Sequence, residues 1–226
     1  MRLLIDNTQV ELINKAYEFY PISGVTTNPT ILSKVGGNPF EILRQIREMI
    51  GEEEMHVQVI STKADEIVEE AKHIVNILGR ETFVKIPAID EGFKAMKILS
   101  YTTEISFTAT AVYTTMQAFI AAECGAAYVA PYVNRIDNLG YNGIEVVKQI
   151  KNFLINNGME TEILAASFKN SQQVVELLEY GIDAVTVAPD ILKNFVKNAA
   201  VDSAIEDFIS DFESFAGEGK TMKDFK

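Results

Sequence analysis

The chain has 226 residues, of which 47% are hydrophobic, and a formal net charge of −12 at pH 7. This length fits one domain and lies within the size range of a bare eight-fold α/β barrel. The negative charge argues against nucleic acid as a general partner, because the field of the whole protein repels a polyanion. A small phosphorylated substrate stays possible, since local arginines or helix N-termini can hold one phosphate.

Features of membrane and secreted proteins are missing from the sequence. No apolar run approaches the roughly 18 residues that a membrane span needs, and the first residues, Met1 to Asp6, lack the long apolar core of a signal peptide. Cys124 is the only cysteine, so no intrachain disulfide can form. We therefore expect a cytoplasmic protein with no membrane partner, in which Cys124 is a packed small residue.

Short β-rich segments recur along the chain, with amphipathic stretches between them. The predicted strands are residues 2–6, 22–26, 55–60, 82–87, 104–110, 127–132, 162–167 and 183–187. The predicted helices include residues 39–50, 63–78, 91–99, 115–124, 144–156, 171–180 and 190–197. A strand followed by a helix, repeated eight times, indicates a single (β/α)8 TIM barrel of the α/β class. The alternative is an open doubly wound sheet, which usually has fewer strands and a glycine-rich first turn that is missing here.

Several helix starts carry capping signals. Thr8-Gln-Val-Glu11 has the pattern of a capping box. Asn28-Pro29 and Asn38-Pro39 each place an N-cap residue before a proline at the first helical position.

The C-terminal part of the chain continues beyond the eight predicted units. Apolar residues fall there at helical spacing: Val201, Ile205, Phe208, Ile209, Phe212 and Phe215. We predict a catalytic barrel over residues 1–201 and a helical tail over residues 202–226. Because the barrel is complete without this tail, its apolar face is expected to pack partly on a neighbouring subunit of a homo-oligomer.

The fourth predicted strand contains a lysine that we expect inside the barrel. Side chains alternate along a strand, so if Val84 and Ile86 face the helices, Lys85 faces the barrel axis. Burial there lowers the pKa of an amine, and a neutral amine can attack a ketone to form an iminium ion. The alternative is a lysine at a strand end that reaches solvent.

The fifth predicted strand supports a polar interior. Ser106, Thr108 and Thr110 share one face, and apolar residues occupy the other. Because the apolar face must contact helices, the hydroxyl row points into an interior that branched apolar residues normally fill. This pattern indicates a functional upper interior.

Further polar residues follow other strands, at the end of a barrel where active sites lie. They are Asp6, Asn28, Gln58, Tyr132, Arg135, Ser167 and Lys169. Structural alternatives exist: Asp6 could cap the first helix, Asn28 could cap its own helix, and Gln58 could be a structural hydrogen-bonding residue. Ser167 and Lys169 precede a helix at a place where barrels often bind phosphate. The convergence of all these residues on one end favours a functional site.

Neither histidine suggests a catalytic scheme. His73 lies within a predicted helix among charged residues, and His56 lies one pleat below Gln58. No Cys, His and Asp spacing indicates a metal site, so we expect no metal and no cofactor.

Five segments in order resemble the signature segments of the transaldolase family, and the match is closest to its small fructose-6-phosphate aldolase branch. They are Gly24-Val-Thr-Thr-Asn-Pro29, Phe83-Val-Lys-Ile-Pro87, Thr110-Ala-Val-Tyr113, Tyr128-Val-Ala-Pro-Tyr-Val-Asn-Arg-Ile-Asp137 and Leu164-Ala-Ala-Ser-Phe-Lys169. The likeness covers residues 1 to about 215.

The resemblance implies a residue set for Schiff-base chemistry. Lys85 would form the Schiff base and Asp6 would transfer protons, with Gln58, Tyr132 and Thr110 as further catalytic residues. The implied substrate-binding residues are Thr26, Asn28, Thr108, Arg135, Ser167 and Lys169, of which the last three would surround the phosphate. The resemblance also implies a ring-based homo-oligomer such as a decamer of two pentamers.

Some positions differ between the two branches of this family. Transaldolases usually carry glutamate at the position of Gln58, phenylalanine at that of Tyr132 and asparagine at that of Thr108, so this chain is more similar to the aldolase branch. Lys169 replaces an arginine common in transaldolases, which would hold phosphate by a point charge rather than a bidentate fork.

The resemblance implies a class I aldolase that interconverts fructose 6-phosphate with dihydroxyacetone and glyceraldehyde 3-phosphate. The first alternative is a transaldolase, which transfers the dihydroxyacetone unit between the sugar phosphates of pentose phosphate metabolism. The second alternative is a phosphosugar-binding barrel without turnover, which would have no need to retain Lys85, Asp6 and Thr110 together.

Overall fold

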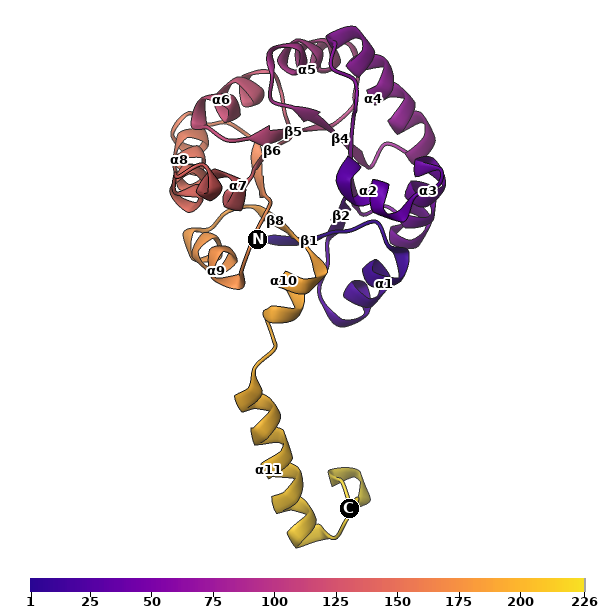
Figure 1. Cartoon of the computed structure of the whole chain (residues 1–226), viewed down its shortest axis with the longest axis vertical. Helices are drawn as coiled ribbons and strands as arrows, with labels where there is room; N and C mark the ends of the chain where they lie inside the picture. Colours follow the sequence, from indigo (N-terminus) through magenta and orange to yellow (C-terminus); the bar gives the residue numbers. More distant parts are fainter. Residues whose placement is uncertain (226) are drawn as a thin grey trace.

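The computed structural model describes residues 1–225. Eight parallel strands form a closed barrel in the order β1 to β8, with helices outside it (Figure 1). The predicted (β/α)8 barrel is therefore confirmed. Its strands are β1 (Arg2–Asp6), β2 (Gly24–Thr26), β3 (Glu54–Gln58), β4 (Thr82–Pro87), β5 (Phe107–Val112), β6 (Tyr128–Pro131), β7 (Glu162–Ala165) and β8 (Ala184–Val187).

Helices lie between successive strands and after the last one. They are α1 (Val10–Phe19), α2 (Pro29–Val35), α3 (Pro39–Ile50), α4 (Ala64–Leu78), α5 (Asp90–Thr102), α6 (Thr115–Glu123), α7 (Val133–Asn138), α8 (Gly143–Asn156), α9 (Ser171–Tyr180), α10 (Pro189–Asn194) and α11 (Ala199–Ala216). A single 3-10 turn, Met222–Asp224, follows α11.

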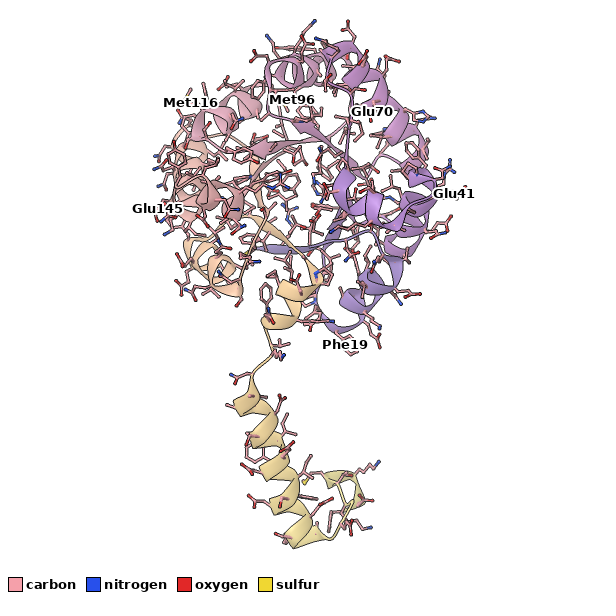
Figure 2. All side chains as sticks on the ribbon, viewed as in Figure 1. Phe19, Glu41, Glu70, Met96, Met116 and Glu145 are labelled. Carbon is pink, nitrogen blue, oxygen red and sulfur yellow. The ribbon has the colours of Figure 1, made fainter. Side chains whose placement is uncertain are left out.

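The apolar side chains of the strands divide between two regions. Those that face outward, such as Val84 and Ile86 of β4, belong to the large core shared with the helices. A separate small cluster of Leu4, Tyr128 and Leu164 with Ala184 lies on the opposite, inward-facing set of positions. Figure 2 shows that side chains occupy the middle of the ring, which the ribbon of Figure 1 leaves open. The interior is thus a packed core.

The predicted start of the fifth strand at Glu104 is wrong, because β5 begins at Phe107. Glu104 is exposed and pairs with Arg80, so it belongs to the loop that enters the strand. α5 extends to Thr102, beyond the predicted end at residue 99. α10 ends at Asn194 rather than at residue 197.

Two of the three predicted helix caps are confirmed. The side chains of Asn28 and Asn38 accept hydrogen bonds from the backbone N–H groups of Ile31 and Phe40. The predicted capping box at Thr8 is wrong, because the Thr8 hydroxyl donates to the carbonyl of Ile31, 3.0 Å away. The Thr8 hydroxyl, which was predicted to cap α1, therefore bonds to the backbone of α2 instead.

The described chain has no helix whose length and apolar character would allow it to cross a membrane.

The tail forms a helix that leaves the barrel. α11 begins three residues before the predicted boundary and extends away from the ring (Figure 1). Most of its large apolar residues stay exposed, including Phe208 at 70% and Phe215 at 82%. Phe212 and Phe215 contact Phe225, which folds back on them. The remaining position of the predicted tail, Lys226, lies outside the described residues.

Exposed apolar stripes of this kind usually mark an interaction surface. The division at residue 201 and the packing of the tail on a neighbouring subunit stay predictions. Removal of residues 203–226 should reduce the size of the oligomer in size-exclusion chromatography. The double variant Phe208→Ser/Ile209→Ser should act in the same direction, whereas Asp207→Asn, on the other side of α11, should not. Unchanged elution of both the truncated chain and the double variant would contradict the role of the tail.

Candidate functional site

A cavity of about 360 Å³ lies at the C-terminal ends of the strands. Seven residues predicted from the sequence line it: Asp6, Asn28, Gln58, Lys85, Tyr132, Arg135 and Ser167. The structure therefore brings together side chains from β1, β3 and β4 with residues that follow β2, β6 and β7. Active sites of (β/α)8 barrels occupy this end of the fold.

Lys85 is almost completely buried at this cavity. Its side chain faces inward as predicted, with only 5% of the residue exposed. The Nζ atom donates a hydrogen bond to the backbone carbonyl of Thr27, 2.8 Å away. Burial lowers the pKa of Lys85, the carboxylate of Asp6 raises it, and the guanidinium of Arg135 lowers it. The net pKa is below the ordinary value for lysine, which favours the nucleophilic amine.

A chain of hydroxyl groups and an amide orients the carboxylate of Asp6. Thr26 Oγ1 donates to Asp6 Oδ1 at 2.7 Å and lies 2.7 Å from Thr186 Oγ1. Because a hydroxyl has one proton, Thr186 must donate to Thr26. Asn28 Nδ2 donates to the other oxygen, Asp6 Oδ2, at 3.3 Å. Asn28 therefore both caps α2 and contacts Asp6, and Asp6 lines the cavity and does not cap α1.

Tyr132 and Thr110 form a second polar pair. Their hydroxyl oxygens are 2.7 Å apart, and Thr110 is fully buried behind the cavity. The register of β5 against β6 shifts between Ala109 and Val112, and Ala111 has a φ of 54°. Positive φ is strained for a residue with a side chain, and bulges often re-aim side chains beside active sites. The irregular backbone thus directly follows Thr110.

Arg135 and Ser167 lie on one side of the cavity. The Arg135 guanidinium carbon lies 4.6 Å from the centre of the Tyr132 ring, which holds the charge at the cavity. Ser167 has a φ of 63° and, with Ala111, is one of two non-glycine residues with positive φ in the described chain. Ser167 lines the cavity, and Ala111 follows Thr110, whose hydroxyl contacts the cavity residue Tyr132. A guanidinium beside a hydroxyl provides donors for an anionic oxygen group.

The remaining predicted residues lie elsewhere. Lys169 is exposed and is not among the residues that line the cavity. Thr108 is completely buried and contacts Nδ1 of His56 at 2.9 Å, which places it behind the cavity.

Two contributors to the site were not predicted from the sequence. Thr186 lines the cavity and supports Asp6 through Thr26. Thr186 alternates with Val185 and Val187 along the strand, and this pattern could have predicted that its hydroxyl faces the barrel interior. The carbonyl of Thr27 accepts the hydrogen bond from Lys85, and no side-chain pattern reports a backbone group.

A larger cavity, of about 670 Å³, opens at the N-terminal ends of the strands. It is lined by residues such as Arg2, Glu54 and Glu162 and contains no lysine. The described residues contain no group of three or more His, Cys, Asp or Glu side chains that could hold a metal ion. The arrangement around Lys85 thus joins a buried amine, a carboxylate, a phenol and a cationic corner. These groups are suited to covalent chemistry on a carbonyl compound that carries an anionic group.

Comparison with known proteins identifies the family of this chain. The family model described as "Transaldolase/Fructose-6-phosphate aldolase" matches residues 3–224. A probable fructose-6-phosphate aldolase of Streptococcus pneumoniae is 38% identical over 196 residues, which cover 86% of this chain and 88% of that protein. A probable transaldolase of Thermoplasma volcanium is 37% identical, with coverage of 85% and 86%. A probable transaldolase 1 of Bacillus cereus is 35% identical, with coverage of 87% and 90%. The chain belongs to the transaldolase/fructose-6-phosphate aldolase family.

Proposed function

We propose that the protein is a class I aldolase that cleaves and forms fructose 6-phosphate through a Schiff base on Lys85. The observation that carries this proposal is the burial of Lys85 at the cavity, with its pKa lowered and Asp6 nearby. A buried amine of this kind is a better nucleophile at neutral pH than an exposed lysine.

The reaction begins when the neutral Lys85 amine adds to the C2 ketone of the sugar phosphate. Loss of water then gives an iminium ion, which accepts electrons from the bond that breaks. Asp6, directly or through water, removes the proton of the C4 hydroxyl, and the C3–C4 bond breaks. Glyceraldehyde 3-phosphate leaves, and an enamine of dihydroxyacetone stays bound to Lys85.

The enamine must then be protonated and hydrolysed to release dihydroxyacetone. Tyr132 is our candidate acid–base group for this step, because it lines the cavity and its hydroxyl is fixed by Thr110. Gln58 lines the same cavity and can orient water. General acid–base catalysis of this type contributes roughly 10²–10⁴-fold.

The phosphate of the substrate is assigned to Arg135 and Ser167. The position of Arg135 supports this role, because its charge is held against the Tyr132 ring at the edge of the cavity. Lys169 is exposed, so its contribution would be through long-range attraction, which solvent weakens.

A transaldolase is the second candidate, because two of the relatives described above are named probable transaldolases. In that reaction the enamine on Lys85 attacks a second aldose phosphate instead of being hydrolysed. Gln58 and Tyr132 favour the aldolase, since their positions differ from the usual transaldolase pattern.

A paired assay separates the two reactions. The enzyme is incubated with fructose 6-phosphate alone and then with erythrose 4-phosphate added, and free dihydroxyacetone and sedoheptulose 7-phosphate are measured. We expect release of dihydroxyacetone without the acceptor. Sedoheptulose 7-phosphate with the acceptor, and no dihydroxyacetone without it, would identify a transferase. No product in either assay would favour the binding barrel without turnover.

Arg135→Ala tests the phosphate site. Loss of a charged hydrogen-bond donor should raise KM for fructose 6-phosphate roughly ten- to a hundredfold, because such bonds contribute about 1.5–3 kcal/mol. Because Arg135 also lowers the pKa of Lys85, Schiff-base formation with unphosphorylated dihydroxyacetone is compared at alkaline pH, where more of the Lys85 amine is neutral in both proteins, and its rate should change little there. Arg44→Ala, on the exposed face of α3, is the control and should behave as the wild type. Equal losses with both substrates would show that Arg135 is structural.

A further inference from the structure

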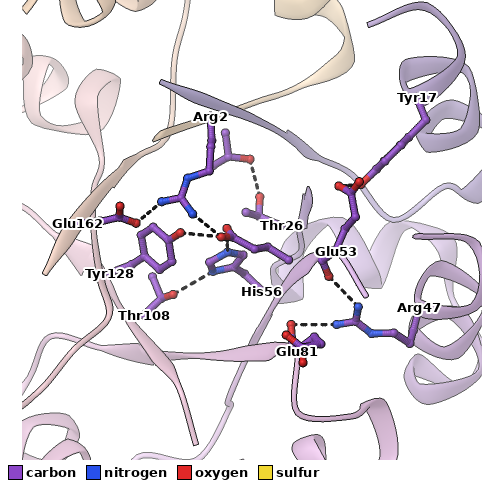
Figure 3. Close-up of polar contacts among 12 residues, drawn as sticks. Arg2, Tyr17, Thr26, Arg47, Glu53, His56, Glu81, Thr108, Tyr128 and Glu162 are labelled. Carbon is purple, nitrogen blue, oxygen red and sulfur yellow. Dashed lines mark hydrogen bonds and ion pairs between the residues drawn. The ribbon is translucent and has the colours of Figure 1, made fainter. Parts of the chain in front are cut away.

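The lower interior of the barrel contains a polar network beneath the proposed active site. Figure 3 shows Arg2, His56, Thr108, Tyr128 and Glu162 converging there from five different strands. Barrel interiors are normally filled by branched apolar residues. A continuous set of polar groups at this place therefore requires a reason.

His56 is the centre of this network. It is completely buried, its ring stacks on Phe83 at 4.8 Å, and Tyr128 meets it edge-on at 5.3 Å. Its two nitrogens face different groups. Nδ1 lies 2.9 Å from Thr108 Oγ1, and Nε2 lies 3.5 Å from Glu54 Oε2.

Glu54 is fixed from the other side. Its Oε1 atom accepts hydrogen bonds from Tyr128, at 2.8 Å, and from Arg2. Arg2 also pairs with Glu162. Burial raises the pKa of Glu54, but the interactions with His56, Tyr128 and Arg2 outweigh it and hold the pKa below the ordinary value. Glu54 is therefore a carboxylate at neutral pH and can only accept hydrogen bonds.

These contacts determine the tautomer of His56. Burial lowers the pKa of His56, while Glu54 raises it less strongly, so the ring is neutral and carries one N–H. A lone pair on Nε2 would be repelled by the facing carboxylate oxygen, which places the proton on Nε2. Nδ1 is then an acceptor, and the Thr108 hydroxyl must donate to it.

The direction of the Thr108 hydroxyl matters because of its neighbour. Thr108 and Lys85 are register partners on β5 and β4. Both side chains face the interior, on backbones about 5 Å apart. Since its single proton points to His56, Thr108 presents only oxygen lone pairs to the layer that contains Lys85.

We infer that His56 is a positioning residue for the Schiff-base reaction: with Glu54 behind it, it keeps the Thr108 hydroxyl directed away from Lys85. The negative end of this hydroxyl dipole then favours the positive charge that develops on the Lys85 nitrogen in the iminium ion. Such fixed dipoles stabilise a charge without reorganisation during the reaction. This inference rests on the proposed function, because it requires a Schiff base at Lys85.

The titratable and charged groups around this chain come from several strands and one helix. Those near His56 are Glu54, Arg2, Tyr128, Glu162 and Lys85. Those near Lys85 are Asp6, Arg135, Tyr132 and His56. A positive charge on His56 and one on Lys85 disfavour each other, so a neutral His56 is also needed when the iminium ion forms.

The test uses His56→Phe, which keeps an aromatic ring against Phe83 but frees the Thr108 hydroxyl, and Thr108→Val, which removes the hydroxyl. Both should destabilise a cation at Lys85 and so lower its pKa further. The acidic limb of the kcat/KM profile, which reports the free enzyme, should move to lower pH by about 0.4 to 1 unit. The fraction of Lys85 trapped by borohydride at a subsaturating dihydroxyacetone concentration should fall about two- to tenfold.

Three further variants make this test specific. His56→Asn keeps an acceptor near the position of Nδ1 and should retain the wild-type pH limb. The double variant His56→Phe/Thr108→Val should move the limb no further than His56→Phe alone, because both changes remove one interaction. The control is His73→Phe, which changes the other histidine of the chain, on the exposed face of α4. It should leave the acidic limb of the kcat/KM profile and the trapped fraction of Lys85 unchanged.

Several outcomes would overturn the inference. In one, His56→Phe and Thr108→Val lower activity, but the acidic limb of the kcat/KM profile and the trapped fraction of Lys85 stay as in the wild type. This result would indicate that His56 and Thr108 are purely structural. Another is a limb in His56→Asn that moves as far as in His56→Phe. If His56→Phe does not fold, Thr108→Val alone decides. Failure of the wild type to form any adduct would instead refute the proposed function.

Discussion

The structure of the site depends on the removal of one lysine amine from water. Lys85 is held inside the barrel by alternation along β4, whose outward residues Val84 and Ile86 belong to the core shared with the helices. Its hydrogen bond goes to a neutral carbonyl, that of Thr27. A carboxylate at that position would have stabilised the ammonium form and reduced nucleophilicity. Asp6 is nearby, but Thr26 and Asn28 fix its two oxygens. The chain thus separates the proposed nucleophile from the proposed proton-transfer group.

The barrel interior has a polar upper layer and a polar network below it, joined at Thr108. Above, hydroxyl groups orient Asp6 and Tyr132. Below, Arg2 and Tyr128 compensate the charge of the partly buried Glu54 carboxylate. The two polar layers require many partners from different strands. The least satisfied atoms of this network are His56 Nε2 and Glu54 Oε2, which face each other at 3.5 Å and have no other partner among the described residues.

The sequence predicted the parts of this architecture that depend on local pattern. Alternation of side chains placed Lys85, Thr108 and Thr110 inside the barrel, and proline after asparagine identified the starts of α2 and α3. The sequence predictions were wrong or incomplete where contacts between residues far apart in the chain determine the structure. The Thr8 hydroxyl bonds to Ile31 across 23 positions, and His56 and Thr108 meet across 52. The exposure of Lys169 depends on how the loop after β7 leaves the barrel, which residue spacing does not report.

The most direct measurement is the mass of the peptide that contains Lys85 after borohydride reduction in the presence of dihydroxyacetone. The account predicts that this peptide gains one reduced three-carbon unit and that exposed lysines such as Lys94 and Lys97 stay unmodified. It also predicts no adduct in the variant Lys85→Met. Turnover of fructose 6-phosphate by an enzyme whose Lys85 peptide keeps its original mass under these conditions would contradict the account.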